Sequence, residues 1–238
     1  ILPVKSTNKT SIFLEDGKEL IDGMSSWWST IHGYNHPKLN DALKKQIEIM
    51  PHIMFGGLAH EQSSLLAKKL VDLTGLHSVF LCDSGSVSVE VALKTAILYQ
   101  KAKGLKKFKF LALENAYHGD TLGAMSVCDP QNSMHSIYGS YLSENIFVKA
   151  PKLGFSSDCS EEIKALEEAF EKHHEEIAAF IVEPIVQGAG GMRIYNPEYL
   201  KKARELCTKY DVLLIADEIA TGFGHTGKMF ACEWAEIK

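Results

Sequence analysis

The sequence of 238 residues lacks several features that would place it in a particular class of protein. No hydrophobic run approaches the roughly 20 residues that a helix needs to cross a bilayer. The 25 basic residues do not outnumber the 30 acidic ones, and the net charge is −5. This balance argues against a nucleic-acid-binding protein, which usually carries a basic patch. The sequence also shows no internal repeat, low-complexity tract or linker.

The cysteines are few and widely spaced, and none belongs to a Cys-x-x-Cys motif or to a Cys/His spacing typical of zinc sites. We therefore expect no metal site. Scattered thiols are typical of a reducing compartment, so we expect a cytoplasmic protein. The sequence begins with Ile1 and not Met, which suggests that the natural N-terminus lies upstream. The lack of a signal peptide therefore adds little to this expectation.

Hydrophobic periodicity predicts alternating strands and helices along most of the chain. Short apolar runs, typical of strands buried on both faces, lie at 78–82, 108–113, 145–148, 178–182 and 212–216. Helical periodicity occupies 39–50, 61–74, 87–100, 161–177 and 197–210, with Ser160 and Asn196 as N-cap candidates. A hairpin is expected around Asp16-Gly17. This order predicts an α/β fold with a mostly parallel sheet flanked by helices.

Two acids and a glycine-rich turn follow the last apolar run. Asp217 and Glu218 come directly after 212–216, and glycines recur from 222 to 227. The carboxyl end of a buried parallel strand is where open α/β sheets bind ligands. A carboxylate buried there needs a cationic partner, and the ring nitrogen of a protonated pyridine cofactor would supply one.

A second motif, Ser84-Gly85-Ser86, lies between the apolar run at 78–82 and a predicted helix. Backbone N–H groups at a helix N-terminus bind anions, and glycine leaves room for a phosphate to approach. The alternative is an ordinary turn in which the serines only cap the helix.

Two further motifs contain aromatic residues. Tyr117-His118-Gly119-Asp120 follows the run at 108–113, and its Tyr could stack on a flat ring. The tandem pair Trp27-Trp28 could wall a substrate pocket. Core packing is the alternative for both motifs.

The predicted strand at 178–182 also ends in a motif, with Glu183 as its acid. Glu183 could hold a loop through a salt bridge or lie near the hydroxyl side of a cofactor. We favour the salt bridge. Motifs therefore follow several strands at one predicted sheet edge, where a doubly wound fold brings its ligand contacts together.

Taken together, the motifs resemble those of the class III aminotransferases, which are pyridoxal-phosphate (PLP) enzymes of fold type I. The resemblance covers essentially the whole chain, through D-G-M-S-S-W-W, I-H-G-Y-N-H-P, M-F-G-G, D-S-G-S-V-S-V-E-V-A, Y-H-G-D-T, E-P-I-V-Q-G-A-G-G-M and A-D-E-I-A-T-G-F-G. The tandem Trp and the stretch S-V-C-D-P-x-N-S-M-H are similar to one branch of the family. That branch transfers an amino group from S-adenosylmethionine to 8-amino-7-oxononanoate, giving 7,8-diaminononanoate in biotin biosynthesis.

The resemblance implies roles for individual residues. Gly85 and Ser86 would hold the PLP phosphate, and Tyr117 would stack on the ring and line the substrate site. Asp217 would pair with the pyridinium nitrogen, so that the ring acts as an electron sink. Trp27 would wall the substrate pocket.

Four other residues would support the site: His118, Asp120, Glu183 and His225. His225 departs from the family, which usually has arginine at this position in G-F-G-R-T-G. Arginine carries a permanent charge in a planar fork, whereas histidine titrates near neutrality. This change leaves the amino donor open, and a related aminotransferase that uses another donor, such as lysine, is an alternative.

The resemblance also implies a domain division and a homodimer. Residues 1–35 would belong to the small domain, and 36–238 to a PLP-binding large domain that stops before the Schiff-base lysine of the family. We therefore expect an incomplete large domain plus the N-terminal part of the small one. This chain alone would be an inactive fragment, whereas the parent protein would be the enzyme.

One rival enzyme class is a dinucleotide-binding oxidoreductase, because residues 222–227 literally match G-x-G-x-x-G. Five residues separate this match from its strand, whereas the dinucleotide fingerprint follows its strand directly. The acid expected about 20 residues later does not occur within the sequence. This class therefore remains a remote alternative.

Overall fold

The computed structural model describes residues 1–132 and 135–237. Ser133 and Met134 of the predicted motif S-V-C-D-P-x-N-S-M-H, and Lys238, lie outside the described residues. The chain divides into two compact units, Ile1–Leu73 and Thr74–Lys238, which are described separately.

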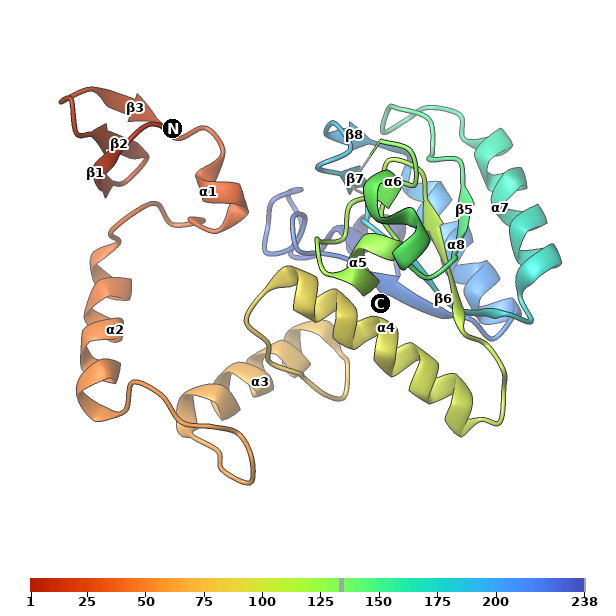
Figure 1. Cartoon of the computed structure of the whole chain (residues 1–238), viewed down its shortest axis with the longest axis horizontal. Coiled ribbons are helices and arrows are strands. Elements are labelled where there is room, and N and C mark those ends of the chain that lie inside the picture. Colours follow the sequence, from red (N-terminus) through yellow and green to blue (C-terminus); the bar gives the residue numbers. More distant parts are fainter. Residues whose placement is uncertain (133–134, 238) are drawn as a thin grey trace. The chain divides into compact units, whose positions relative to one another are not determined.

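The first unit begins with an antiparallel sheet in the order β1-β2-β3 (Figure 1). Its strands are β1 Val4–Asn8, β2 Ser11–Leu14 and β3 Glu19–Ile21. The Asp16 carboxylate accepts the Lys18 N–H at 3.1 Å and stabilises the turn between β2 and β3. The predicted hairpin is therefore confirmed.

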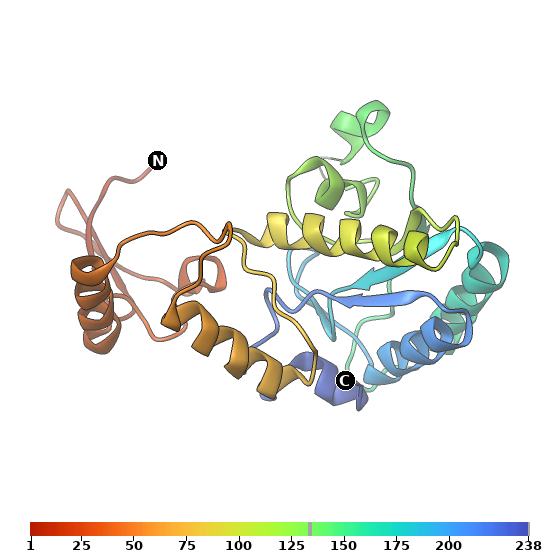
Figure 2. The ribbon, with the colours of Figure 1, turned by 90° about the horizontal axis from the view of Figure 1, so that it is seen from below.

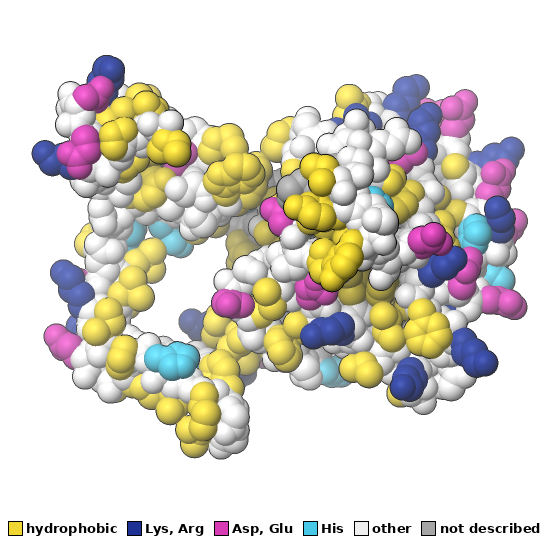
Figure 3. All heavy atoms as spheres, viewed as in Figure 1, with side chains coloured by type: hydrophobic (Ala, Val, Ile, Leu, Met, Phe, Trp, Pro, Cys, Tyr) yellow, Lys and Arg dark blue, Asp and Glu magenta, His cyan; other side chains and the backbone are white. Residues whose placement is uncertain are grey.

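Helices make up the rest of the first unit: α1 Ser25–Trp28, α2 Pro37–Ile49 and α3 Glu61–Thr74. Pro37 occupies the first turn of α2, where a missing N–H costs nothing. The predicted apolar stripe of α2 contains Leu39, Leu43 and Ile47, and all three are exposed. Hydrophobic side chains follow this helix in the space-filling view of Figure 3.

A parallel four-stranded sheet in the order β5-β4-β6-β9 forms the centre of the second unit. Its strands are β4 Lys109–Leu113, β5 Ile146–Val148, β6 Ile177–Val182 and β9 Leu213–Ala216. Every residue of β6 is buried, because helices cover both faces of the sheet. The predicted α/β fold is therefore confirmed.

Figure 2 shows α4 on one side of the sheet and α7 and α8 on the other. These helices span α4 Gly85–Ala102, α7 Ser160–His173 and α8 Pro197–Lys209. Val89 and Leu93 of α4 pack on one face of the sheet, whereas Leu166, Phe170 and Tyr199 pack on the other. The Asn196 side chain accepts the Glu198 N–H at 3.0 Å, as its predicted cap role requires.

Short elements connect these layers, and most lie near the carboxyl edge of the sheet. They are α5 Leu122–Ser126, α6 His135–Tyr138, η1 Gly139–Tyr141, β7 Val186–Gln187, β8 Arg193–Ile194 and η2 Ala231–Ala235. Within residues 1–132 and 135–237, no helix combines the length and the apolar character that a membrane span requires.

Three local predictions are wrong. The helix predicted over 161–177 ends at His173, and Ile177 begins strand β6. Segment 78–82 is irregular and not a strand, and Phe80 is 70% exposed. A strand requires a neighbouring backbone, and none of the described strands pairs with this segment. Ser160 is the first residue of α7 and not its N-cap, because Cys159 occupies the cap and the Asp158 carboxylate accepts the Ser160 N–H.

Candidate functional site

Loops that follow three neighbouring strands bring the candidate residues to one edge of the sheet. Tyr117 and His118 follow β4, Glu183 follows β6, and Asp217 follows β9. The three strands are parallel and β6 lies between the other two, so their carboxyl ends meet.

The most buried polar contact at this edge joins His118 to Asp217. The His118 Nδ1 lies 2.7 Å from the Asp217 Oδ2, and the two side chains are 0% and 5% exposed. The Asp217 Oδ1 also accepts the Ile219 N–H at 3.1 Å.

The other ring nitrogen of His118 indicates its tautomer. Nε2 is buried and has no hydrogen-bond partner among the described residues. A proton on Nε2 would lack an acceptor, which is costly in a buried place. The arrangement therefore suits a ring that carries a hydrogen on Nδ1 and donates it to the Asp217 carboxylate.

The N-terminus of α4 contacts the loop after β4. The Ser84 side chain caps the helix by accepting the Val87 N–H at 3.2 Å. The Ser86 Oγ lies 2.8 Å from the Thr121 Oγ1 and accepts the Thr121 N–H at 2.9 Å. The helix N-terminus, with its partial positive charge, is thus fixed beside the loop that carries Tyr117.

Glycines permit this close approach. Gly119 has φ +129°, and a Cβ there would lie 2.5 Å from the Ser86 Oγ. At Gly85, a Cβ would lie 3.0 Å from the Ile219 side chain, which follows β9. The three motifs at 84–86, 117–121 and 217–219 are therefore in direct contact.

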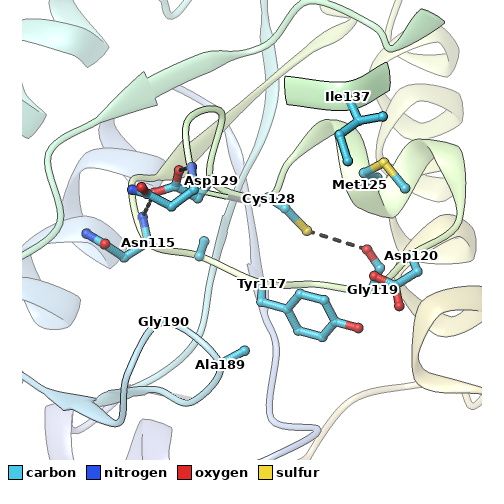
Figure 4. Close-up of a pocket in the computed structure, with 12 residues that line it drawn as sticks. Asn115, Tyr117, Gly119, Asp120, Met125, Cys128, Asp129, Ile137, Ala189 and Gly190 are labelled. Carbon is cyan, nitrogen blue, oxygen red and sulfur yellow. Dashed lines mark hydrogen bonds between the residues drawn. The ribbon is translucent and has the colours of Figure 1, made fainter. Parts of the chain in front are cut away.

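A cavity of about 550 Å³ opens beside Tyr117. Figure 4 shows the Tyr117 ring between Asp120 and the segment that contains Ala189 and Gly190. Partial burial and then the neighbouring Asp120 carboxylate raise the pKa of Tyr117 to about 12. The phenol therefore stays protonated at neutral pH, beside the Asp120 carboxylate and the apolar Met125 side chain.

Asp217 lines a second cavity of about 330 Å³, together with Ser88 and Val89 of α4 and the apolar Ile219 and Phe223. The site therefore offers a buried anion, a helix N-terminus and an aromatic ring within one unit.

Glu183 is 6% exposed and connects two loops. Its Oε1 accepts the Tyr117 N–H at 3.1 Å, and its Oε2 accepts the Gly188 N–H at 2.9 Å. Burial raises the pKa of this carboxyl. The residue holds a loop as predicted, but the partners are backbone N–H groups and not the cation of the expected salt bridge.

Two candidate residues make no described contact with these side chains. Trp27 belongs to the first unit and is 77% exposed there. His225 lies in the loop after β9, is exposed, and its Nδ1 is 2.8 Å from the Ala220 carbonyl oxygen.

Glu218 has a role that the sequence did not indicate. Its carboxylate accepts the Thr221 hydroxyl at 2.6 Å, the Ala231 N–H at 3.0 Å and the Cys232 N–H at 2.8 Å. These bonds close the glycine-rich loop that contains His225. The only signal in the sequence was its position next to Asp217.

The glycine-rich segment at 222–227 is followed by a short 3-10 helix, Ala231–Ala235, and it does not open an α-helix. A dinucleotide fingerprint requires that helix, so the oxidoreductase alternative loses its structural basis. Across the described part of the chain, no group of three His, Cys, Asp or Glu side chains is arranged to hold a metal ion.

Comparisons with known proteins find similar aminotransferases. The adenosylmethionine-8-amino-7-oxononanoate aminotransferase of Buchnera aphidicola subsp. Baizongia pistaciae is 52% identical over 237 residues, covering 98% of this chain and 55% of that protein. The enzyme of the same name from Saccharomyces cerevisiae is 49% identical over 250 residues, covering 97% of this chain and 52% of that protein.

Two solved structures are similar in fold. The crystal structure of the enzyme of that name from Methanocaldococcus jannaschii has a TM-score of 0.91 and 33% identity, and the match covers 98% of this chain and 52% of that one. A PLP-bound amine transaminase from an uncultivated Pseudomonas species has a TM-score of 0.90 and 31% identity, with 100% of this chain and 56% of that one covered.

This chain therefore spans about half the length of the curated relatives that it matches. The family model described as aminotransferase class-III matches residues 1–238. The chain belongs to the class III aminotransferase family, with the α/β fold of the fold-type I PLP enzymes.

Proposed function

We propose that this chain contributes the PLP-binding region of an aminotransferase that acts in biotin biosynthesis. The complete protein would transfer an amino group from S-adenosylmethionine to 8-amino-7-oxononanoate and yield 7,8-diaminononanoate. The observation that carries the proposal is the buried pair of Asp217 and His118, which lies at the strand ends near the N-terminus of α4.

The residues present suit the chemistry of PLP. Its phosphate is an anion, and the α4 N-terminus offers N–H groups at Gly85 and Ser86. Its protonated ring nitrogen is a cation, and Asp217 offers a buried carboxylate. Its ring is flat, and Tyr117 offers an aromatic face.

When bound, PLP supplies an electron sink that stabilises negative charge developing at the substrate α-carbon. The negative charge of Asp217 would keep the proton on the ring nitrogen. His118 would orient Asp217 by donating its Nδ1–H to Oδ2, which fixes the direction of the carboxylate. Tyr117 would offer its ring to stack on that of PLP, and it forms one wall of the cavity that would take the substrate.

Other parts of the proposal rest on the family. Trp27 would wall the substrate pocket, and Asp120, Glu183 and His225 would support the site. Residues 1–35 would belong to the small domain and 36–238 to the large domain. The complete protein would be a cytoplasmic homodimer.

A direct test is single-turnover amino transfer by the complete protein, with S-adenosylmethionine and lysine compared as amino donors. We expect transfer from S-adenosylmethionine and little from lysine. The reverse preference would support the alternative of a related class III enzyme with another donor. The change to His225 motivates this comparison. Absence of PLP binding would overturn the whole proposal.

A further inference from the structure

Two loops form facing walls of the 550 Å³ cavity, and they come from different strands. The loop after β4 contributes Tyr117, and the turn between β7 and β8 contributes Ala189 and Gly190. Figure 4 shows these residues facing one another across the cavity. The distance between the loops therefore sets how wide a substrate the cavity accepts.

One carboxylate hydrogen-bonds to the backbone of both walls. Each oxygen of Glu183 accepts one backbone N–H: Oε1 from Tyr117 and Oε2 from Gly188, the residue before Ala189. The side chain is almost completely buried, so water competes poorly for these bonds. Hydrogen bonds to a charged acceptor are among the strongest in proteins.

Nearby contacts leave little freedom around this carboxylate. The Tyr195 hydroxyl donates to the Glu183 carbonyl oxygen at 2.7 Å, which fixes the backbone from which the side chain extends. The Gln187 side chain donates to the Glu114 carbonyl oxygen at 2.9 Å, a second bridge between the same loops. At Gly190, a Cβ would lie 2.2 Å from the Asn115 carbonyl oxygen, so the loops are already in close contact.

We propose that Glu183 is a positioning residue that sets the width of the substrate cavity by tying the backbone of Tyr117 to that of Gly188. It touches neither the α4 N-terminus nor Asp217 in any hydrogen bond described above. At saturating PLP, its effect should therefore fall mainly on which substrates fit. The inference rests on the proposed function, because it takes the cavity to be the substrate site.

The substitution Glu183→Gln tests this role with little change in size. An amide has one acceptor oxygen, and its NH₂ group would face a backbone N–H, so one of the two bonds is lost. The assay is amino transfer to 8-amino-7-oxononanoate and to a bulkier analogue with a benzyl group in place of its C9 methyl. Both are measured in the complete protein at saturating PLP.

We compare kcat/KM for 8-amino-7-oxononanoate, divided by kcat/KM for the benzyl analogue. This ratio should fall about tenfold in Glu183→Gln, which corresponds to about 1.4 kcal/mol. The change in kcat/KM should lie mainly in KM, because the position of the cavity walls affects how tightly each acceptor binds more than it affects the chemical step. Glu162→Gln is the matched control: Glu162 is also 6% exposed but lies on α7, and it should leave the ratio unchanged. An unaltered ratio in Glu183→Gln would overturn the proposal.

Hydrogen exchange in the unsubstituted protein gives a second test, which does not depend on folding of the variant. The amides of Tyr117 and Gly188 should be protected to a similar degree, because one buried carboxylate holds both. If either amide exchanged as fast as an amide in an open loop, the proposed link through Glu183 would be refuted. If both amides are protected but the complete protein transfers no amino group, the proposed function fails, whereas the link through Glu183 is still supported.

Discussion

Asp217→Asn is the substitution that most directly tests how this site holds a cationic ring. The amide is nearly the same size as the carboxylate but carries no charge. In the unsubstituted protein the His118 Nδ1–H and the Ile219 N–H bind different oxygens of Asp217. The amide has only one oxygen, so it can keep one of these two bonds in place and loses the other. Removing one partner of a buried ion pair costs about 3–5 kcal/mol. At about 1.4 kcal/mol per factor of ten, amino transfer should slow by about a hundredfold to a few thousandfold.

The assay is the single-turnover rate of amino transfer in the complete protein, with far-UV circular dichroism to check folding. Glu162→Gln serves as the control, since it removes a buried charge on α7 and should leave the rate within about twofold. A rate for Asp217→Asn within threefold of the unsubstituted protein would refute the assignment of Asp217 to the ring nitrogen.

Three further predictions concern the surroundings of the site. Gly119→Ala should reduce PLP affinity at least tenfold in an equilibrium titration, because its Cβ would press on the Ser86 hydroxyl at 2.5 Å and its φ of +129° is strained; unchanged affinity would argue against the close approach. An alkylating reagent at pH 8 should modify the exposed Cys82 and leave Cys128 intact by peptide mass, because burial raises the pKa of the Cys128 thiol to about 11; early loss of Cys128 would contradict this. Burial opposes ionisation of Asp129, but backbone N–H donors outweigh burial and lower the pKa of this carboxyl. The ionised carboxylate therefore stabilises the fold above the unfolded pKa of 3.8, and this stabilisation is lost as the pH falls through the folded pKa. Asp129→Asn should therefore reduce the free energy of unfolding by about 2 kcal/mol at pH 7 in urea titrations, and by progressively less as the pH falls from 3.8 through the folded pKa; a loss that stayed constant down to the lowest pH at which the protein folds would count against this reasoning.

The sequence was informative about the sheet and about where its ligand-binding edge lies. Unbroken apolar runs require burial on both faces, and such strands are parallel strands covered by helices. Polar motifs directly after β4, β6 and β9 then had to meet at one edge, because parallel strands share their direction. His118 and Asp217 are 99 residues apart in sequence, yet this rule alone brings them close.

Other features depend on contacts that leave no periodic pattern in the sequence. Segment 78–82 is as apolar as a strand, but strand formation depends on a distant partner backbone. Glu183 and Glu218 bind backbone N–H groups, which every residue type except proline carries, so no side-chain motif could reveal their partners. Trp27 lies in the first unit, and its place in the substrate pocket remains a proposal.

The central claim is that these residues form part of a PLP site in a working aminotransferase. The most direct measurement is the intact mass of the purified source protein before and after PLP addition and borohydride reduction. The account predicts a polypeptide well above 26.4 kDa that gains a single reduced PLP group. A species of 26.4 kDa that gains no specific adduct would contradict it.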